Sequence, residues 1–360
     1  MKYAIILGTR PEIIKMSPII RELQSRTSEY FILHTGQHYS YKMDKVFFKE
    51  LDLPAPKYNL NVGSTSDTEQ IGNMLIGIGR ILHQEEPDVT LVLGDTNTVL
   101  AGTLAGAKLH LKLGHVEAGL RSYDRTMPEE INRIIADHSS DYLFAPTEST
   151  KTNLLKEGIH SKKIFVTGNT IVDALYQNLK IANKKTNSIS NLQLEPRGYF
   201  LATVHRQENV DNPVRFAGIL EGLGLVCQEF GIPVIYPIHP RSQKRMSEFG
   251  LQANNIRFIE PLDFLNFLQL ESNAMLILTD SGGVQEEACI LNIPCVTLRD
   301  NTERPETIEV GSNILAGAIP NRILMSSRIM LEKKNSWRNP FGDGKAGERI
   351  VRLIRRSLEE

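Results

Sequence analysis

Short apolar segments typical of β-strands alternate along the chain with longer amphipathic segments typical of helices. In the first half the apolar segments are residues 3–7, 30–35, 88–95, 113–119, 141–146 and 163–168. After a polar stretch at 180–198 they resume at residues 199–205, 232–240, 255–262, 274–280, 293–298 and 312–317. Continuously apolar strands separated by helices indicate parallel sheets covered on both faces. The pattern predicts an α/β protein with two doubly wound, Rossmann-like domains facing across a cleft.

The length of 360 residues supports two domains of ordinary size. We expect one Rossmann-like domain at residues 1–172 and another at 173–344, and we place a linker near the start of the polar stretch at 180–198. Residues 345–360 have the pattern of an amphipathic helix, with Ile350, Val351 and Ile354 on one side. This helix can pack on either half, and we expect it to pack back on the N-terminal domain.

The charge balance excludes several classes of partner. Forty-one basic and 42 acidic residues leave a net charge of −1, which indicates neither a nucleic-acid face nor a polybasic membrane patch.

Cys227, Cys289 and Cys295 form no CxxC pair, so we expect neither a disulfide framework nor a zinc site. The apolar run that ends at Gly8 is too short for a signal peptide, and no segment is long enough to span a membrane. We expect a cytoplasmic protein.

Polar residues that follow the predicted strands of the first half are candidates for a site, because ligands collect beyond the carboxyl ends of parallel strands. Arg10 and Lys15 bracket the start of a predicted helix, where an anion between them would make sense; alternatively, both are solvated. Three carboxylates also belong to this group: Asp95, Glu117 and Glu129. Asp95 can instead cap a helix, and Glu129, like Glu130, can simply favour a helix start. Glu117 has no such structural explanation.

The second half contains the segment TDSGGVQEEA at residues 279–288. Its glycines allow close approach of the backbone to a ligand, and the N–H groups of residues 282–284 would open a helix, which suits an anion. The segment lacks the Gly-Lys-Ser/Thr ending of a P-loop, which disfavours ATP or GTP hydrolysis. Arg304 follows a later strand and can meet phosphate oxygens, and Glu287 can accept from ribose hydroxyls or act as an ordinary surface glutamate.

Five histidines stand at strand ends: His34, His38, His115, His205 and His239. None has the spacing of a known metal motif, so we expect no catalytic metal. A GxGxxG pattern at residues 342–347 does not follow a strand, so it does not indicate a bound NAD or FAD. We therefore expect no cofactor.

Seven motifs, taken together and in order, resemble the non-hydrolysing UDP-N-acetylglucosamine 2-epimerases. They are GTRPEIIKMSP, LVLGDTNTVLAG, GHVEAGLRS, PEEINR, VHRQEN, LTDSGGVQEEA and RDNTERPE, and they run from Gly8 to about Gly311. The resemblance implies a GT-B fold, a homodimer and interconversion of UDP-GlcNAc and UDP-ManNAc, with the uridine diphosphate between the two halves.

The resemblance also implies roles for individual residues. The catalytic positions would be Asp95, Glu117, Glu129 and His205. The phosphates would be held by Arg10, Lys15, His205, Ser281, Gly282, Gly283 and Arg304. Glu287 would bind the ribose and Phe267 would lie beside the uracil, although Phe267 can equally be a core aromatic residue. Some relatives bind a second UDP-GlcNAc as an activator, and the region involved is matched in part by Gln37, His38, Arg206 and His239.

The implied chemistry is elimination of UDP to 2-acetamidoglucal followed by its return, which needs a carboxylate and a second acid on opposite faces of C2. Which of the three carboxylates serves which face is open. Three other functions remain alternatives: a UDP-sugar-dependent GT-B glycosyltransferase, a hydrolysing 2-epimerase and a non-catalytic nucleotide-sugar sensor.

Overall fold

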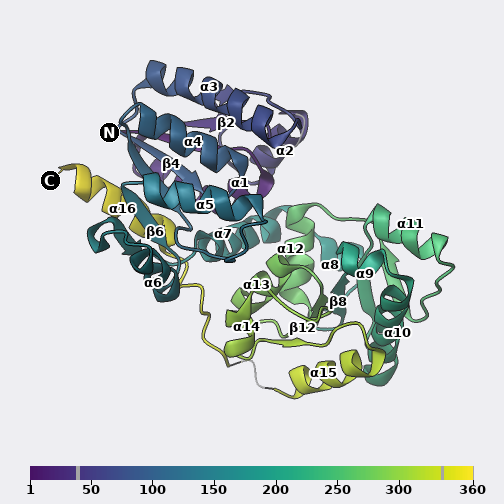
Figure 1. The fold of residues 1–360 in the computed structure, drawn as a ribbon. Coiled ribbons are helices and arrows are strands. Elements are labelled where there is room, and N and C mark those ends of the chain that lie inside the picture. Colours follow the sequence, from purple (N-terminus) through teal and green to yellow (C-terminus); the bar gives the residue numbers. More distant parts are fainter. Residues whose placement is uncertain (38–40, 334–335, 360) are drawn as a thin grey trace. The chain divides into compact units, whose positions relative to one another are not determined.

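Every apolar segment predicted to form a strand does so, in one of two parallel sheets (Figure 1). The structure, a computed structural model, describes residues 1–37, 41–333 and 336–359, and it describes residues 41–44 by their backbone alone. Contacts divide the chain into a first unit, Met1–Gln177 with Phe341–Glu360, and a second unit, Asn178–Pro340. The domain boundaries at residues 172 and 344 stay a prediction.

The sheet of the first unit has the strand order β3-β2-β1-β4-β5-β6-β7. Its strands are β1 (Lys2–Leu7), β2 (Glu29–His34), β3 (Tyr58–Asn59), β4 (Val89–Leu93), β5 (Lys112–Val116), β6 (Tyr142–Ala145) and β7 (Ile164–Val166). The sequence pattern did not indicate β3, because a two-residue edge strand is too short to show a period. It pairs with Leu33 and His34 at the end of β2.

The helices of this unit are α1 (Arg10–Ser25), α2 (Tyr41–Glu50), α3 (Asp67–Glu85), α4 (Asn97–Lys108), α5 (Pro128–Ser139), α6 (Glu148–Lys156) and α16 (Ala346–Glu359), with a 3₁₀ turn at Ser161–Lys163. Helix α7 (Thr170–Lys185) begins in this unit and continues into the second, which starts at Asn178. The polar stretch expected to begin with a linker begins instead inside α7, whose Ala182 is completely buried.

Helices cover both faces of the first sheet. Ala4 and Ile6 of β1 share an apolar cluster with residues of α3, α4 and α5, which lie in a row in Figure 1. Because side chains alternate along a strand, Tyr3 points to the other face, where Arg355 and Glu359 of α16 act on the pKa of its hydroxyl. Helix α16 packs on α1, and Asp173 accepts hydrogen bonds from the first two backbone amides of α16, at 3.1 and 2.9 Å. The predicted C-terminal helix therefore packs in the first unit.

The second sheet has the order β10-β9-β8-β11-β12-β13. Its strands are β8 (Phe200–Thr203), β9 (Val234–Pro237), β10 (Ile256–Ile259), β11 (Leu276–Thr279), β12 (Cys295–Thr297) and β13 (Asn313–Leu315). The helices are α8 (Ser188–Asn191), α9 (Gln207–Val210), α10 (Pro213–Phe230), α11 (Pro240–Glu248), α12 (Phe264–Asn273), α13 (Gly282–Ile290), α14 (Pro305–Glu309) and α15 (Pro320–Glu332).

Helices cover both faces of the second sheet as well, so this unit also has three layers. Phe200 and Ala202 of β8 join a cluster with α10 and α15, whereas Leu201, between them, joins a second cluster with α12 and α13. The alternation along one strand thus divides the apolar side chains between the two faces. Helices α12 and α13, which carry the candidates Phe267, Gly282, Gly283 and Glu287, share one face.

A glycine of α10 tests how tightly that helix is packed, and a glycine of α3 serves as its control. A Cβ on Gly218 of α10 would lie 2.3 Å from the carbonyl oxygen of Ala318, so Gly218→Ala should lower the free energy of unfolding by about 1–3 kcal/mol. Gly72 of α3 has open space around it, and Gly72→Ala should leave stability unchanged or raise it by up to about 1 kcal/mol. Urea and thermal unfolding measure both, and equal effects would contradict the close approach.

Candidate functional site

The strand order reverses between β1 and β4 in the first sheet and between β8 and β11 in the second. At such a point consecutive crossovers leave in opposite directions and open a crevice at the carboxyl ends of the strands. Arg10 and Asp95 follow the first pair of strands, and His205 and Ser281 follow the second pair. The structure therefore brings the sequence candidates together in two groups, one in each unit.

A buried glutamate that the sequence analysis did not single out organises the turn after β1. Glu12 accepts hydrogen bonds from the amides of Gly8 and Thr9 at 2.7 and 2.8 Å, and from the hydroxyl of Thr96 at 2.6 Å. Together with the Thr9 side chain it forms a capping box at the start of α1, a pattern readable in the sequence as Thr-x-x-Glu. The turns after β1 and β4 are thereby joined.

Gly8 and Arg10 illustrate how closely this turn is packed. A Cβ on Gly8 would lie 2.1 and 2.3 Å from the hydroxyl oxygens of Thr35 and Thr98, so only glycine fits there. The guanidinium of Arg10, the first residue of α1, lies 5.8 Å from the ring centre of Phe47. Arg10 is thus held by an aromatic face beside the switch point.

Glu117 lies just beyond β5 in an uncommon backbone conformation. Its φ angle is +67°, in the left-handed region that residues other than glycine rarely occupy. Its side chain is almost completely buried and forms an ion pair with Lys15 of α1 at 2.7 Å. Strain of this kind persists only where the surroundings enforce it, and it occurs often at functional sites. Neither the ion pair nor the left-handed backbone can be inferred from residue order.

A buried ionic network holds the strand that presents Glu117. His115 lies completely buried, with Nδ1 2.7 Å from Asp137 and Nε2 2.8 Å from the carbonyl oxygen of Gly94. Both ring nitrogens face acceptors, which is the arrangement of an imidazolium. Burial lowers the pKa of His115, but Asp137 and the Gly94 carbonyl outweigh that effect and raise it. Asp137 also accepts from the buried Arg121 at 2.7 Å.

The other two carboxylates of the first group differ in exposure. Asp95 is about one third exposed and pairs with Arg133 of α5, while Thr96, and not Asp95, caps α4. Glu129 lies exposed in the first turn of α5. Its neighbour Glu130 is buried and accepts from the amides of residues 122 and 123 at 2.9 and 3.0 Å, so it has a structural role.

In the second unit the glycine segment starts a helix, as the sequence predicts. Ser281 is the N-cap of α13 and its hydroxyl accepts from the amide of Val284. Gly282 is the first helical residue, and Gly283 is exposed. The first turn of α13 therefore presents backbone N–H groups at the carboxyl end of β11, where the helix dipole favours an anion.

Asp280, which the sequence analysis did not single out, connects this segment to His205. It is completely buried and accepts from the backbone amides of His205 and Arg206 at 3.0 and 2.9 Å. Its Oδ1 also lies 3.3 Å from Nδ1 of His205, a side chain that is about half exposed. Burial raises the pKa of Asp280, but these contacts outweigh it and lower the pKa. The ionised Asp280 orients His205 so that Nε2 remains available to a ligand.

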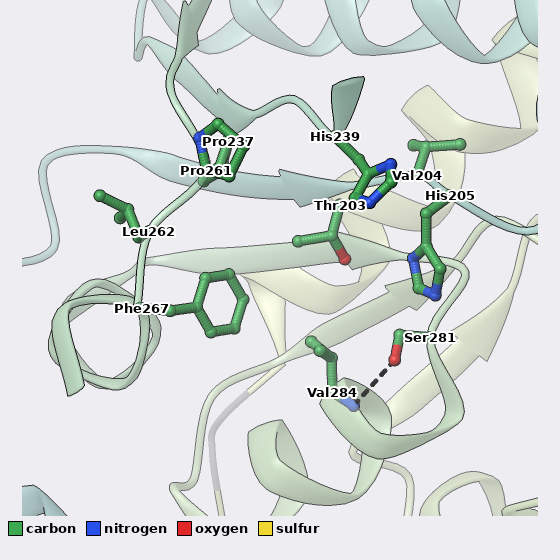
Figure 2. A pocket seen from close by; sticks show the side chains of 10 residues that line it. All are labelled: Thr203, Val204, His205, Pro237, His239, Pro261, Leu262, Phe267, Ser281 and Val284. Carbon is green, nitrogen blue, oxygen red and sulfur yellow. Dashed lines mark hydrogen bonds between the residues drawn. The ribbon is translucent and has the colours of Figure 1, made fainter. Parts of the chain in front are cut away.

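A cavity of about 210 Å³ adjoins these residues within the second unit. Figure 2 shows His205 and Ser281 on one side of it and Phe267 on another, with the ring of Phe267 directed into the cavity. The remaining lining residues are Thr203, Val204, Pro237, His239, Pro261, Leu262 and Val284. An aromatic ring and apolar side chains suit a flat base, and the polar end beside His205 and Ser281 suits a charged group.

Arg304 lies beside α13. Its Nε donates to Glu286 at 3.2 Å, and Glu286 belongs to the same helix as the glycine segment. Glu303 lies close to that segment as well, because a Cβ on Gly282 would come within 3.2 Å of its Oε2. Glu287, one turn into α13, is partly exposed.

The residues of the allosteric hypothesis are only partly described. His38 lies outside the described residues. Gln37 is buried and its side-chain carbonyl accepts from the hydroxyl of Thr98 at 2.8 Å. Arg206 and His239 belong to the second unit, where His239 caps α11 and lines the cavity. The hypothesis stays a prediction.

Among residues 1–37, 41–333 and 336–359, no cluster of three or more His, Cys, Asp or Glu side chains has the arrangement needed to hold a metal ion. None of the helices within those ranges combines the length and apolarity needed to cross a bilayer.

Removing the charge of Asp137 tests the buried network. Asp137→Asn leaves His115 and the Arg121 side chain, which are 0% and 1% exposed, without their shared counter-ion. We expect a loss of about 3–5 kcal/mol in the free energy of unfolding, measured with urea at neutral pH. The control Asp300→Asn removes a carboxylate that is 64% exposed and pairs with Arg215, and it should change stability by less than about 1 kcal/mol.

The same network predicts a pH dependence. Because the pKa of His115 is raised above its ordinary value of 6.5, its contribution to stability is fully present below that value and is lost as the pH rises through the raised pKa. Asp137→Asn should remove this slope. A variant with wild-type stability and an unchanged slope would contradict the network.

Comparison with known proteins agrees with this geometry. The sequence model of the UDP-N-acetylglucosamine 2-epimerase family matches residues 21–355. A UDP-N-acetylglucosamine 2-epimerase from Methanocaldococcus jannaschii is 59% identical, over 98% of this chain and 99% of its own length.

Solved structures agree as well. A UDP-GlcNAc 2-epimerase from Methanocaldococcus jannaschii superposes with a TM-score of 0.92 at 57% identity, covering 99% of each chain. A structure of the enzyme from that organism in complex with UDP-GlcNAc and UDP has a TM-score of 0.83 at 59% identity, again over 99% of each chain. The two-domain, GT-B-like fold expected from the sequence is confirmed. The chain belongs to the UDP-N-acetylglucosamine 2-epimerase family.

Proposed function

We propose that this protein interconverts UDP-GlcNAc and UDP-ManNAc by inverting C2, without hydrolysis and without a cofactor, and that it acts as a homodimer. The observation that carries the proposal is the 59% identity with a UDP-N-acetylglucosamine 2-epimerase over 98% of the chain. A related structure contains UDP-GlcNAc and UDP, which supports a uridine nucleotide as the ligand of the cavity in the second unit.

In this proposal the second unit holds the nucleotide. The uracil lies in the cavity beside Phe267, the ribose hydroxyls donate to Glu287, and the diphosphate meets the first turn of α13. Gly282 and Gly283 leave room for the phosphates to approach the backbone N–H groups. Arg304 contributes a guanidinium from beside the same helix, and His205, oriented by Asp280, donates a hydrogen bond to a phosphate oxygen.

The first step is elimination. The C1–O bond breaks, its electron pair leaves on the β-phosphate of UDP, and C1 gains oxocarbenium character that acidifies C2–H. A carboxylate of the first unit takes the C2 proton, and the electrons of the C–H bond form the C1=C2 double bond of 2-acetamidoglucal. The cations Arg10, Lys15 and Arg304 and the amides of α13 stabilise the charge that grows on UDP.

The second step reverses the first on the other face of C2. A proton returns to C2 from the opposite side, and the UDP oxygen adds back to C1. One carboxylate cannot serve both faces readily, which accounts for several acids at this site. Glu117 is the best-positioned of them, because Lys15 and the left-handed turn hold it beyond β5. Asp95 and Glu129 are the candidates for the opposite face.

Incubation with UDP-GlcNAc in deuterated water, followed by NMR of the sugar, tests the reaction. We expect UDP-ManNAc with deuterium at C2 in both epimers at equilibrium, because the proton exchanges with solvent on the enzyme. Free ManNAc with UDP would indicate a hydrolysing enzyme, and UDP release only with an added acceptor would indicate a glycosyltransferase. Bound nucleotide sugar without any exchange would indicate a sensor.

Replacement of Glu117 tests its catalytic role. Glu117→Gln should lower the turnover number by about 10²–10⁴-fold, because an amide cannot take the C2 proton. Binding of UDP, measured by titration calorimetry, should stay close to that of the wild type, since the nucleotide is held by the second unit.

A matched control is Glu148→Gln. Glu148 also pairs with a lysine, Lys151 at 3.2 Å, but its side chain is 75% exposed on α6. It should retain wild-type turnover. Full activity in a folded Glu117→Gln protein would remove Glu117 from the mechanism.

A further inference from the structure

Glu271, in α12, is a buried acid that the proposed mechanism does not use. The residue is completely buried. Across the described part of the chain, no donor gives a hydrogen bond to either of its carboxyl oxygens. An ionised carboxylate in such a place would lack the solvation that it needs. Any role of the Glu271 side chain in this structure must therefore be a role of the protonated acid.

The surroundings of Glu271 offer it little stabilisation as an anion. Its neighbours Leu270 and Ala274 belong to the apolar cluster between the second sheet, α12 and α13. The hydroxyl of Tyr199 donates to the carbonyl of Leu270, and the guanidinium of Arg197 donates to the carbonyl of Ala274. These polar groups are thus engaged by the backbone of α12 and not by the carboxyl of Glu271.

Two titratable groups face Glu271 from the neighbouring elements. Cys295 of β12 is completely buried, and burial together with Glu271 raises the pKa of its thiol, so it is neutral. Glu287 of α13 is partly exposed, and its carboxyl lies within hydrogen-bonding reach of the carboxyl of Glu271. Burial, and then Glu287, raise the pKa of Glu271 well above its usual range.

Two carboxylates in contact cannot both be ionised without repulsion, and neither can donate a hydrogen bond until one is protonated. The proton belongs on the inner acid, Glu271, because Glu287 is the one that water reaches. The protonated carboxyl then donates to the Glu287 carboxylate, a charge-assisted hydrogen bond. Glu287 keeps its charge and its remaining acceptor positions.

The pair lies next to the cavity. Phe267 and Val284 line it from α12 and α13. Glu271 follows Phe267 by four residues and Glu287 follows Val284 by three, so each carboxyl lies on the same helix face as a lining residue, one turn further along. The Glu287 carboxylate is thus beside the wall of the proposed nucleotide site, and Glu271 is behind it.

We propose that Glu271 is a positioning residue for nucleotide binding: its protonated carboxyl fixes the Glu287 carboxylate so that it accepts hydrogen bonds from the ribose hydroxyls of the uridine nucleotide. The inference rests on the proposed function, in which Glu287 binds the ribose. It adds that Glu271, which does not contact the ligand, makes the nucleotide site prefer ribose over deoxyribose.

Titration calorimetry of the full-length protein with UDP and with 2′-deoxy-UDP tests this role. The wild type should bind UDP about tenfold more tightly or better, because a hydroxyl bonded to a carboxylate is lost in the deoxy ligand. Glu271→Leu removes the donor, and the ratio of the two dissociation constants should fall toward one. Glu271→Gln keeps a neutral donor of similar shape, and the ratio should stay near the wild-type value.

The pH profile separates positioning from simple packing. Above the raised pKa of Glu271 a second negative charge appears beside Glu287, so UDP binding by the wild type should weaken as the pH rises through that pKa. This step should be absent in Glu271→Gln. The control Glu229→Gln, at the end of α10, should keep both the wild-type ratio and the step.

Several outcomes would overturn the inference. One is a folded Glu271→Leu protein with the wild-type preference for UDP and the wild-type pH profile, which would make Glu271 a core residue only. Another is the absence, in infrared spectra at neutral pH, of a protonated carboxylic acid band that Glu271→Gln removes. Failure of the wild type to bind UDP at all would instead reject the proposed function, and the infrared band would still decide whether Glu271 holds a proton.

Discussion

The parallel pairing of β1 with β4 and of β8 with β11 determines where the polar residues of the candidate site lie. In each pair, the helices that follow the two strands lie on opposite faces of the sheet. The turns after the two strands therefore separate and leave their polar groups accessible. Arg10 and Asp95 are neighbours in space only because β1 pairs with β4, across more than eighty residues of sequence. His205 and Ser281 in the second sheet are likewise brought together by the pairing of β8 with β11.

Buried acids then hold these turns in place, and their protonation states differ with their partners. Asp280 accepts from backbone amides and from the Asn209 side chain, and Asp137 meets Arg121 and His115; these contacts favour the ionised form of both. Glu271 meets another carboxyl and apolar side chains, which favours the protonated form. An ionised Asp280 orients His205, whereas a neutral Glu271 can donate to Glu287. The same functional group therefore performs opposite tasks within one unit.

The first unit concentrates strain and charge at the end of β5. Glu117 adopts a left-handed backbone conformation, pairs with Lys15 and follows a strand anchored by the His115–Asp137 ion pair. In the proposed mechanism Glu117 is the base that takes the C2 proton, and such a base benefits from preorganisation because little rearrangement is left for the reaction itself. Asp95 and Glu129, the proposed candidates for the opposite face, are more exposed.

Residue order alone determined the alternation of strands and helices, since the apolar period predicted every strand except the two-residue β3. It also determined that the glycine segment starts a helix, because a helix start depends on neighbouring residues, here the N-cap Ser281 and the glycines that follow it. The motifs further identified the family. Only the tertiary structure decided which ionisable side chains meet: Lys15 with Glu117, Asp280 with His205, Asp137 with His115 and Arg121, Glu271 with Glu287. These partners lie on different elements, and a side chain's pKa and role depend on burial and on neighbours that the fold brings to it, which no local pattern encodes.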